Sequence, residues 1–184
     1  DGFNVNREVG STHIERLSRL VREEHLDLGF AFDGDGDRCI AVDGEGSVVD
    51  GDAILYILAR RLRARGMLRH DTVAATVMSN SGFVNSLSEL GIKCIQTSVG
   101  DRFVYECMQN SDYALGGEQS GHIIFLDHAT TGDGQLTAVQ LMNLLVTVKK
   151  PLSQLVSEFE DYPQTLLGVK ITPDKKGLWD KTEA

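Results

Sequence analysis

Residues 28–38 read LGFAFDGDGDR, an apolar run that ends directly in three aspartates alternating with glycines and followed by an arginine. The five apolar residues are typical of a buried strand. CIAV at 39–42 predicts a second strand, DGEG at 43–46 a turn and SVV at 47–49 a third strand. The acidic segment is therefore predicted to be a loop between two strands.

Upstream of this strand, apolar residues recur at helical spacing and predict an amphipathic helix over about 12–25, with Ser11 and Thr12 as candidate N-caps. Residues 1–49 carry too little apolar surface for a core of their own. We expect them to be the C-terminal part of a domain whose beginning is absent. They are expected to pack against the following domain or, in a homodimer, against a second copy through exposed strand edges.

From Asp50 onward, predicted helices and strands alternate. Helices are expected at about 52–65, 81–91, 101–110, 134–148 and 152–160, and strands at 72–78, 93–97, 113–116, 122–126 and 166–171. This alternation predicts an α/β layered fold with a mixed β-sheet. We expect a complete domain over 50–172 and a linker or tail over 173–184.

Composition narrows the class of protein. The 184 residues include 18 basic and 27 acidic side chains, so a net charge of −9 disfavours binding to nucleic acid or to anionic membranes. Because there is neither a long apolar run nor a signal-like start, a cytoplasmic protein is predicted. Cys39, Cys94 and Cys107 lack metal-site spacing and are expected to be buried free thiols.

The acidic loop predicts a metal site. Asp33, Asp35 and Asp37 repel one another in a short loop unless a cation compensates them, and hard divalent ions prefer oxygen ligands. A calcium EF-hand is excluded because its sixth and twelfth positions would be Arg38 and Gly44. A solvated acidic turn and an aspartyl-phosphate phosphatase motif remain alternatives.

Two further features favour a phosphorylated substrate. Arg38, next to the acids, could hold phosphoryl oxygens in a bidentate contact or pair with the aspartates. The segment GGEQSGH at 116–122 places Glu118 and Ser120 two residues apart, so that both could contact adjacent sugar hydroxyls. An ordinary polar turn is the alternative for this second loop.

Together these motifs resemble the α-D-phosphohexomutase superfamily and, within it, the bacterial phosphoglucosamine mutases. The resemblance covers nearly the whole chain up to about Ile171. It rests on DGDGDR, GSTH at 10–13, TVMSN at 76–80, VGDRFV at 99–104, GGEQSGHII at 116–124 and TTGDGQLTA at 130–138.

The resemblance implies a four-domain enzyme with phosphohexomutase-type three-layer domains, of which this chain would be the end of domain 2 and all of domain 3. It implies that Asp33, Asp35 and Asp37 bind Mg²⁺. It further implies that Arg38 and Arg102 contact phosphoryl oxygens, that Glu118 and Ser120 bind the sugar, and that Asp101 and His122 are candidates for proton transfer. His122 could also contact a sugar hydroxyl, or be a structural residue at the start of a strand, and Asp101 could simply cap its helix.

The implied reaction interconverts glucosamine 6-phosphate and glucosamine 1-phosphate through a phosphoserine and a bisphosphate sugar, and feeds UDP-N-acetylglucosamine and cell-wall synthesis. The family's phosphoserine segment in domain 1 and its phosphate-clamp segment in domain 4 are absent from these 184 residues. We therefore expect the chain to need those domains for turnover. A mutase for mannose or glucose phosphates and a non-catalytic binding module are the alternatives.

Overall fold

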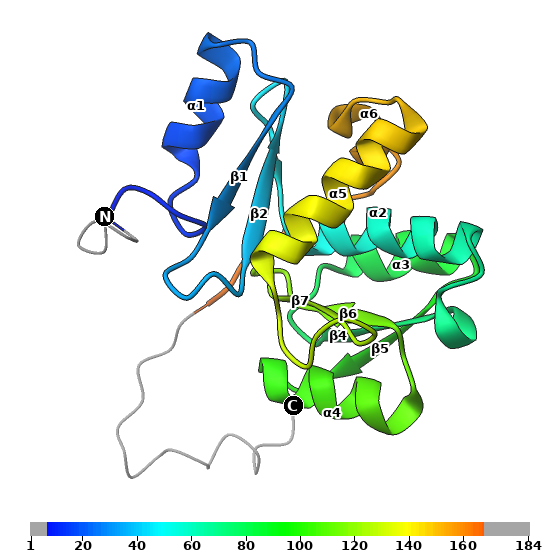
Figure 1. Cartoon of the computed structure of the whole chain (residues 1–184). Helices are drawn as coiled ribbons and strands as arrows, with labels where there is room; N and C mark the ends of the chain where they lie inside the picture. The colour runs from blue at the N-terminus through cyan, green and yellow to red at the C-terminus, as the bar shows by residue number, and fades with distance from the viewer. Residues whose placement is uncertain (1–6, 168–184) are drawn as a thin grey trace, which may run out of the picture.

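A computed structural model describes residues 7–167, which form two β-sheets with helices packed around them (Figure 1). The first part contains α1 (Glu15–Glu23), β1 (Leu28–Phe32), β2 (Cys39–Asp43) and β3 (Val48–Val49). The second part contains α2 (Gly51–Ala64), a 3-10 turn (Arg69–Asp71), β4 (Thr72–Thr76), α3 (Ser81–Glu89), β5 (Lys93–Thr97), α4 (Asp101–Ser111), β6 (Leu115–Gly117), β7 (Ile123–Phe125), α5 (Gly134–Val148) and α6 (Leu152–Val156).

The first sheet is antiparallel, in the order β1–β2–β3, and α1 packs against it. The close approach of α1 needs a glycine in β1, because a Cβ on Gly29 would lie 2.9 Å from the Leu17 side chain. The turn after β2 closes on Asp43, whose carboxylate accepts hydrogen bonds from the amides of Glu45 and Ser47. Strand, acidic loop and hairpin therefore lie where the sequence predicts them.

The second sheet is mixed, in the order β5–β4–β6–β7. Strand β4 pairs in parallel with β5 and β6, and β7 pairs antiparallel with β6. Along β4 the side chains alternate: Val73 and Ala75 join the core shared with α2 and α3, whereas Ala74 packs with Val104 and Met108 of α4 on the other face. The domain is thus a three-layer α/β/α structure, which confirms the predicted fold class.

The two parts pack against each other. Ala41 and Val49 belong to the same buried cluster as Ile54, Leu58 and other residues of the second part. Helix α5 contacts both β1 and β2. Of the two packing arrangements expected for residues 1–49, the structure shows the described part of this segment packed against the part that follows it. A homodimer stays a prediction.

Several predicted boundaries differ from the structure. Helix α1 starts at Glu15 rather than near residue 12, because the amide of Ser11 donates to the Phe32 carbonyl and that of His13 to Gly10. Helix α6 ends at Val156 rather than residue 160. Of the strand predicted at 166–171, only residues 166 and 167 lie in the described part of the chain, and both are exposed and outside regular structure.

The thiols differ in their burial. Cys39 is fully buried, whereas Cys94 and Cys107 are only partly buried, and all three are free. On α4, Phe103 points to solvent with 47% of its surface exposed, although its spacing places it beside the buried Val104 and Met108. Periodicity identifies the inner face of a helix but does not give the width of the surface that a neighbour covers.

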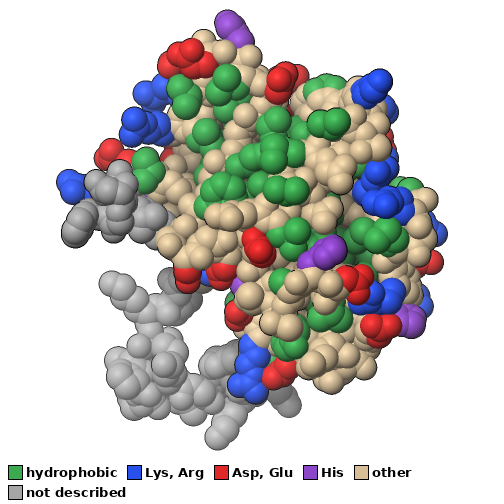
Figure 2. Space-filling model, in the orientation of Figure 1, with side chains coloured by type: hydrophobic (Ala, Val, Ile, Leu, Met, Phe, Trp, Pro, Cys, Tyr) green, Lys and Arg blue, Asp and Glu red, His purple; other side chains and the backbone are tan. Residues whose placement is uncertain are grey.

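Helix α5 is apolar on its outer side as well. Val139, Met142 and Val146 are exposed at helical spacing, and Figure 2 shows hydrophobic side chains gathered in the middle of the face that α5 and β2 occupy in Figure 1. No described helix is both long and apolar enough to cross a membrane.

One buried carboxylate holds the loop after β4. The side chain of Asp52, in the first turn of α2, has no exposed surface, and its Oδ2 accepts a 2.7 Å hydrogen bond from the Asn80 amide. The Asn80 side chain in turn binds the amide and carbonyl of Tyr162. Burial raises the pKa of Asp52 to about 6, while the Asn80 amide partly opposes this shift.

The raised pKa of Asp52 predicts a pH-dependent stability. The folded state holds this proton more tightly than the unfolded state, so the contribution of Asp52 to the free energy of unfolding should fall as pH rises from about 4 through about 6. Asp52→Asn removes the titrating carboxyl group. The free energy of unfolding of the variant minus that of the wild type should therefore increase by about 3 kcal/mol between about pH 4 and about pH 6. Urea unfolding at pH 4, 5, 6 and 7 measures this difference.

The matched control is Glu24→Gln, which removes a carboxylate from an exposed position. Its stability should change with pH in the same way as that of the wild type. Parallel stability curves for wild type and Asp52→Asn between pH 4 and pH 7 would contradict the assignment.

Candidate metal and sugar-phosphate site

The acidic loop joins β1 to β2 and brings its three carboxylates together. Asp33, Asp35 and Asp37 each offer an oxygen that lies within 4.8 Å of the others. Gly36 adopts a left-handed conformation with φ of 75°, which a residue with a side chain rarely adopts. Asp33 is fixed at one end of the loop, where it accepts the Arg38 amide at 3.2 Å.

These residues fit a divalent cation. One oxygen of Asp37, Oδ1, is buried without a hydrogen-bond partner in the described part of the chain. A buried carboxylate oxygen without a partner costs free energy, and three clustered carboxylates repel one another. A cation bound by oxygen ligands would relieve both costs, as Mg²⁺ does at carboxylate sites.

The second loop joins β6 to β7 and is a tight turn. The amide of Gly121 donates to the Glu118 carbonyl, and that of Glu118 donates to the His122 carbonyl, both at 3.0 Å. Oε1 of the Glu118 carboxylate accepts a 3.1 Å hydrogen bond from the amide of Gly100, the residue before α4. One oxygen of Glu118 is therefore held by the protein, which orients the other.

The two loops are bonded directly to each other. Arg38 and His122 form an isolated antiparallel bridge, and the Cys39 amide donates to the Gly121 carbonyl at 3.0 Å. Beneath the second loop, the Gly51 amide donates to the Gln119 carbonyl at 2.9 Å. Backbone hydrogen bonds thus place the acidic loop (33–38), the candidate metal loop, beside the second loop (118–122), the candidate sugar loop.

A cleft of about 430 Å³ lies where the loops meet. Its walls bring together residues from both loops and from the ends of two strands: Arg38, Thr76, Met78, Val99, Glu118, Gln119 and Ser120. Arg38 is half exposed, and its nearest carboxylate oxygen, on Asp33, is 3.8 Å away. Its guanidinium therefore retains donors for an anion in the cleft.

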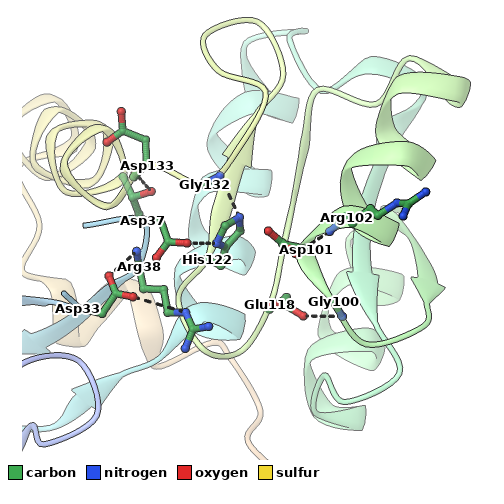
Figure 3. Close-up of polar contacts among 11 residues, drawn as sticks. Asp33, Asp37, Arg38, Gly100, Asp101, Arg102, Glu118, His122, Gly132 and Asp133 are labelled. Carbon is green, nitrogen blue, oxygen red and sulfur yellow. Dashed lines mark hydrogen bonds and ion pairs between the residues drawn. The ribbon is translucent and has the colours of Figure 1, made fainter. Parts of the chain in front are cut away.

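His122 lies beside the acidic loop and is buried, with 3% of its side chain exposed (Figure 3). Its Nε2 accepts the Gly132 amide at 2.9 Å, and its Nδ1 lies 3.0 Å from Asp37 Oδ2. Since the amide can only donate, Nε2 is unprotonated and the ring proton sits on Nδ1, facing Asp37. Both nitrogens are engaged, so the geometry favours an orienting role for His122 in this conformation.

Asp101 and Arg102 lie at the start of α4, away from the acidic loop. The Asp101 carboxylate accepts a 2.8 Å hydrogen bond from the amide of the next residue, Arg102, but it does not cap the helix, because the N-cap of α4 is Gly100 and no side chain bonds there. The Arg102 side chain is 79% exposed, pairs with Glu106 at 2.7 Å and points away from Asp101 and His122 (Figure 3). Neither residue lines the cleft in this structure.

Sequence reasoning gave no role to Thr76, Met78 and Val99, which line the cleft. A signal was available, because Thr76 ends a parallel strand, and ligand sites in such sheets lie beyond the carboxyl ends of the strands. Gly51, Gly132 and Gly134 were missed as supports of the two loops. Their importance comes from close backbone contacts that no local pattern encodes.

Comparison with known proteins identifies the family. Residues 50–162 match the family model described as phosphoglucomutase/phosphomannomutase, alpha/beta/alpha domain III. The chain is 56% identical over 178 residues to a phosphoglucosamine mutase of Anoxybacillus flavithermus and 55% identical over 176 residues to that of Bacillus subtilis. These matches cover 97% and 96% of the chain but only 40% and 39% of the relatives.

A solved structure described as a putative phosphomannomutase from Thermus thermophilus superposes with a TM-score of 0.74 and 25% identity. The superposition covers 85% of this chain and 36% of the Thermus thermophilus chain. The three-layer domain, the paired loops and these similarities together show that the chain belongs to the phosphoglucomutase/phosphomannomutase family.

Proposed function

We propose that this chain is part of a phosphoglucosamine mutase that interconverts glucosamine 6-phosphate and glucosamine 1-phosphate. The observation that carries the proposal is the cleft that Arg38 of the acidic loop lines together with Glu118 and Ser120 of the sugar loop. The relatives named phosphoglucosamine mutase support this substrate over other hexose phosphates. Residues 1–49 would be the end of domain 2, 50–172 domain 3, and 173–184 a linker or tail.

Asp33, Asp35 and Asp37 would hold Mg²⁺, and their clustered oxygens support that assignment. The bound ion would supply charge stabilisation for the transferring phosphoryl group. Arg38 would bind phosphoryl oxygens next to it, since its guanidinium reaches the cleft from the same loop. Acids and arginine together would place the phosphate beside the sugar loop.

Glu118 and Ser120 would bind the sugar. The Gly100 amide holds one Glu118 oxygen, so the carboxylate is pre-oriented for a sugar hydroxyl. His122 stays a candidate for proton transfer or for contact with a sugar hydroxyl, and in this conformation its two ring nitrogens contact Asp37 and the Gly132 amide. Asp101 and Arg102 stay candidates only for a closed form in which α4 meets another domain.

The phosphoserine and the second phosphate clamp would come from domains 1 and 4 of the same polypeptide. The relatives are long enough to contain them, because this chain spans about two-fifths of their length. The chain alone is therefore expected to be inactive. A cytoplasmic location fits a phosphorylated sugar substrate and a role in supplying UDP-N-acetylglucosamine for cell-wall synthesis.

A mutase for mannose or glucose phosphates is the second candidate. It is favoured by the family description and by the Thermus thermophilus structure, described as a putative phosphomannomutase. The two candidates share the metal loop and differ in the sugar hydroxyls that the second loop must recognise.

The first test removes the charge of the metal loop in the full-length enzyme. Replacing Asp33, Asp35 and Asp37 together by asparagine should abolish mutase activity, because neutral amides bind Mg²⁺ poorly. A coupled assay for glucosamine 1-phosphate formation measures the loss, with exposed Glu24→Gln as the control. Full activity of the triple variant would contradict the metal site.

The second test concerns the sugar loop. Glu118→Gln keeps an oxygen for the Gly100 amide but loses the negative charge, so kcat/KM should fall roughly 10-fold to 100-fold. Steady-state kinetics of the full-length enzyme with glucosamine, glucose and mannose 6-phosphates would also rank the substrates. A preference for mannose 6-phosphate would overturn the glucosamine assignment, and unchanged kinetics of Glu118→Gln would overturn its role.

A further inference from the structure

The segment 130–134, TTGDG, touches both functional loops through its backbone. The Gly132 amide donates to His122 Nε2 at 2.9 Å, and the Gly134 amide donates to the Gly36 carbonyl at 3.0 Å. The Asp133 amide donates to the Ile123 carbonyl at 3.4 Å, at the start of β7. Three successive amides therefore bind the sugar loop, the strand after it and the metal loop.

The contacts are too close for any side chain. A Cβ on Gly132 would lie 2.7 Å from the Asp37 carbonyl oxygen and 2.7 Å from ring carbons of His122. A Cβ on Gly134 would lie 2.4 Å from the Arg38 carbonyl oxygen and 2.9 Å from that of Gly36. Both glycines are thus needed for close approach to the metal loop.

The segment is also anchored to a rigid element. The Asp133 side chain caps α5 by accepting the Leu136 amide at 2.8 Å, and the Thr137 amide donates to the Asp133 carbonyl. Helix α5 is a fifteen-residue helix packed into the shared core. Gly134 is the first residue of α5 and Gly132 lies two residues before it, so the helix anchors the segment that contacts the two loops.

We propose that Gly132 and Gly134 are positioning residues that hold the metal loop and the sugar loop in register. Through His122, the Gly132 amide directs the imidazole proton at Asp37 Oδ2 and leaves Oδ1 of that carboxylate free for the cation. Through the Gly36 carbonyl, the Gly134 amide fixes the turn that brings the aspartates together. The inference rests on the proposed metal site, and it assigns the support of that site to the 130–134 segment.

The test uses Gly134→Ala in the 184-residue chain, followed by amide NMR during titration with Mg²⁺. In the wild type, Mg²⁺ should shift the amides of 33–38 and, through the bridge and His122, those of 118–122. In Gly134→Ala, metal affinity should fall roughly 10-fold to 100-fold, as expected when support of a metal ligand is lost. The shifts at 118–122 should disappear.

The control is Thr131→Ala, which alters an exposed side chain of the same segment. It should bind Mg²⁺ and transmit the shifts like the wild type. If Gly134→Ala also behaves like the wild type, or if Thr131→Ala is equally damaged, the positioning role is overturned.

Hydrogen exchange tests the positioning role without metal. The Cys39 amide donates to the Gly121 carbonyl and so reports on the contact between the loops. Its protection factor against exchange should fall about tenfold or more in Gly134→Ala and should not change in Thr131→Ala. Unchanged Cys39 protection would overturn the inference. Failure of the wild type to bind Mg²⁺ would instead contradict the proposed metal site. The exchange of the Cys39 amide would still test whether Gly134 holds the two loops together.

If Gly134→Ala does not fold, His122→Asn provides the same test without added bulk. Its amide can still donate toward Asp37 but cannot reach the Gly132 amide. Beyond the faster exchange of the Gly132 amide that follows from the lost acceptor, the Cys39 amide should also exchange faster than in the wild type, and unchanged Cys39 exchange would overturn the inference.

Discussion

The site depends on hydrogen bonds between two loops that belong to different sheets. The Cys39 amide donates to Gly121, and Arg38 bridges His122, so the loop after β1 and the loop after β6 form one surface. Each loop follows a helix and a strand and precedes an antiparallel strand, in the orders α1–β1–β2 and α4–β6–β7. The same local arrangement is used twice, once for the three aspartates and once for Glu118 and Ser120.

The acidic loop concentrates negative charge. Three carboxylates gather with an oxygen of each within 4.8 Å of the others, and Oδ1 of Asp37 is buried with no hydrogen-bond partner among residues 7–167, which is unfavourable unless a cation binds. Gly132 and Gly134 pack closely against this loop, since a Cβ on Gly132 would lie 2.7 Å from the Asp37 carbonyl oxygen and one on Gly134 2.4 Å from that of Arg38.

The fold class and the two loops could be predicted from the amino-acid sequence. The alternation of helices and strands indicates a layered α/β fold, and LGFAF followed by DGDGDR identifies the strand and its acidic loop. The residues of GGEQSGH predict a second polar loop. Both predictions hold because hydrophobic periodicity and glycine-rich turns are local properties, and β1 and the loop after it coincide with the predicted segments.

Tertiary structure decided which candidates meet. Arg38, Glu118 and Ser120 line one cleft, whereas Arg102, also predicted to contact phosphate, points to solvent and pairs with Glu106. The sequence makes His122 a catalytic candidate, but its partners lie 85 residues upstream, at Asp37, and ten residues downstream, at Gly132. The sequence by itself determined the elements and the kinds of chemical group. Only the folded backbone determined their distances, because contacts between segments far apart in the chain have no local pattern.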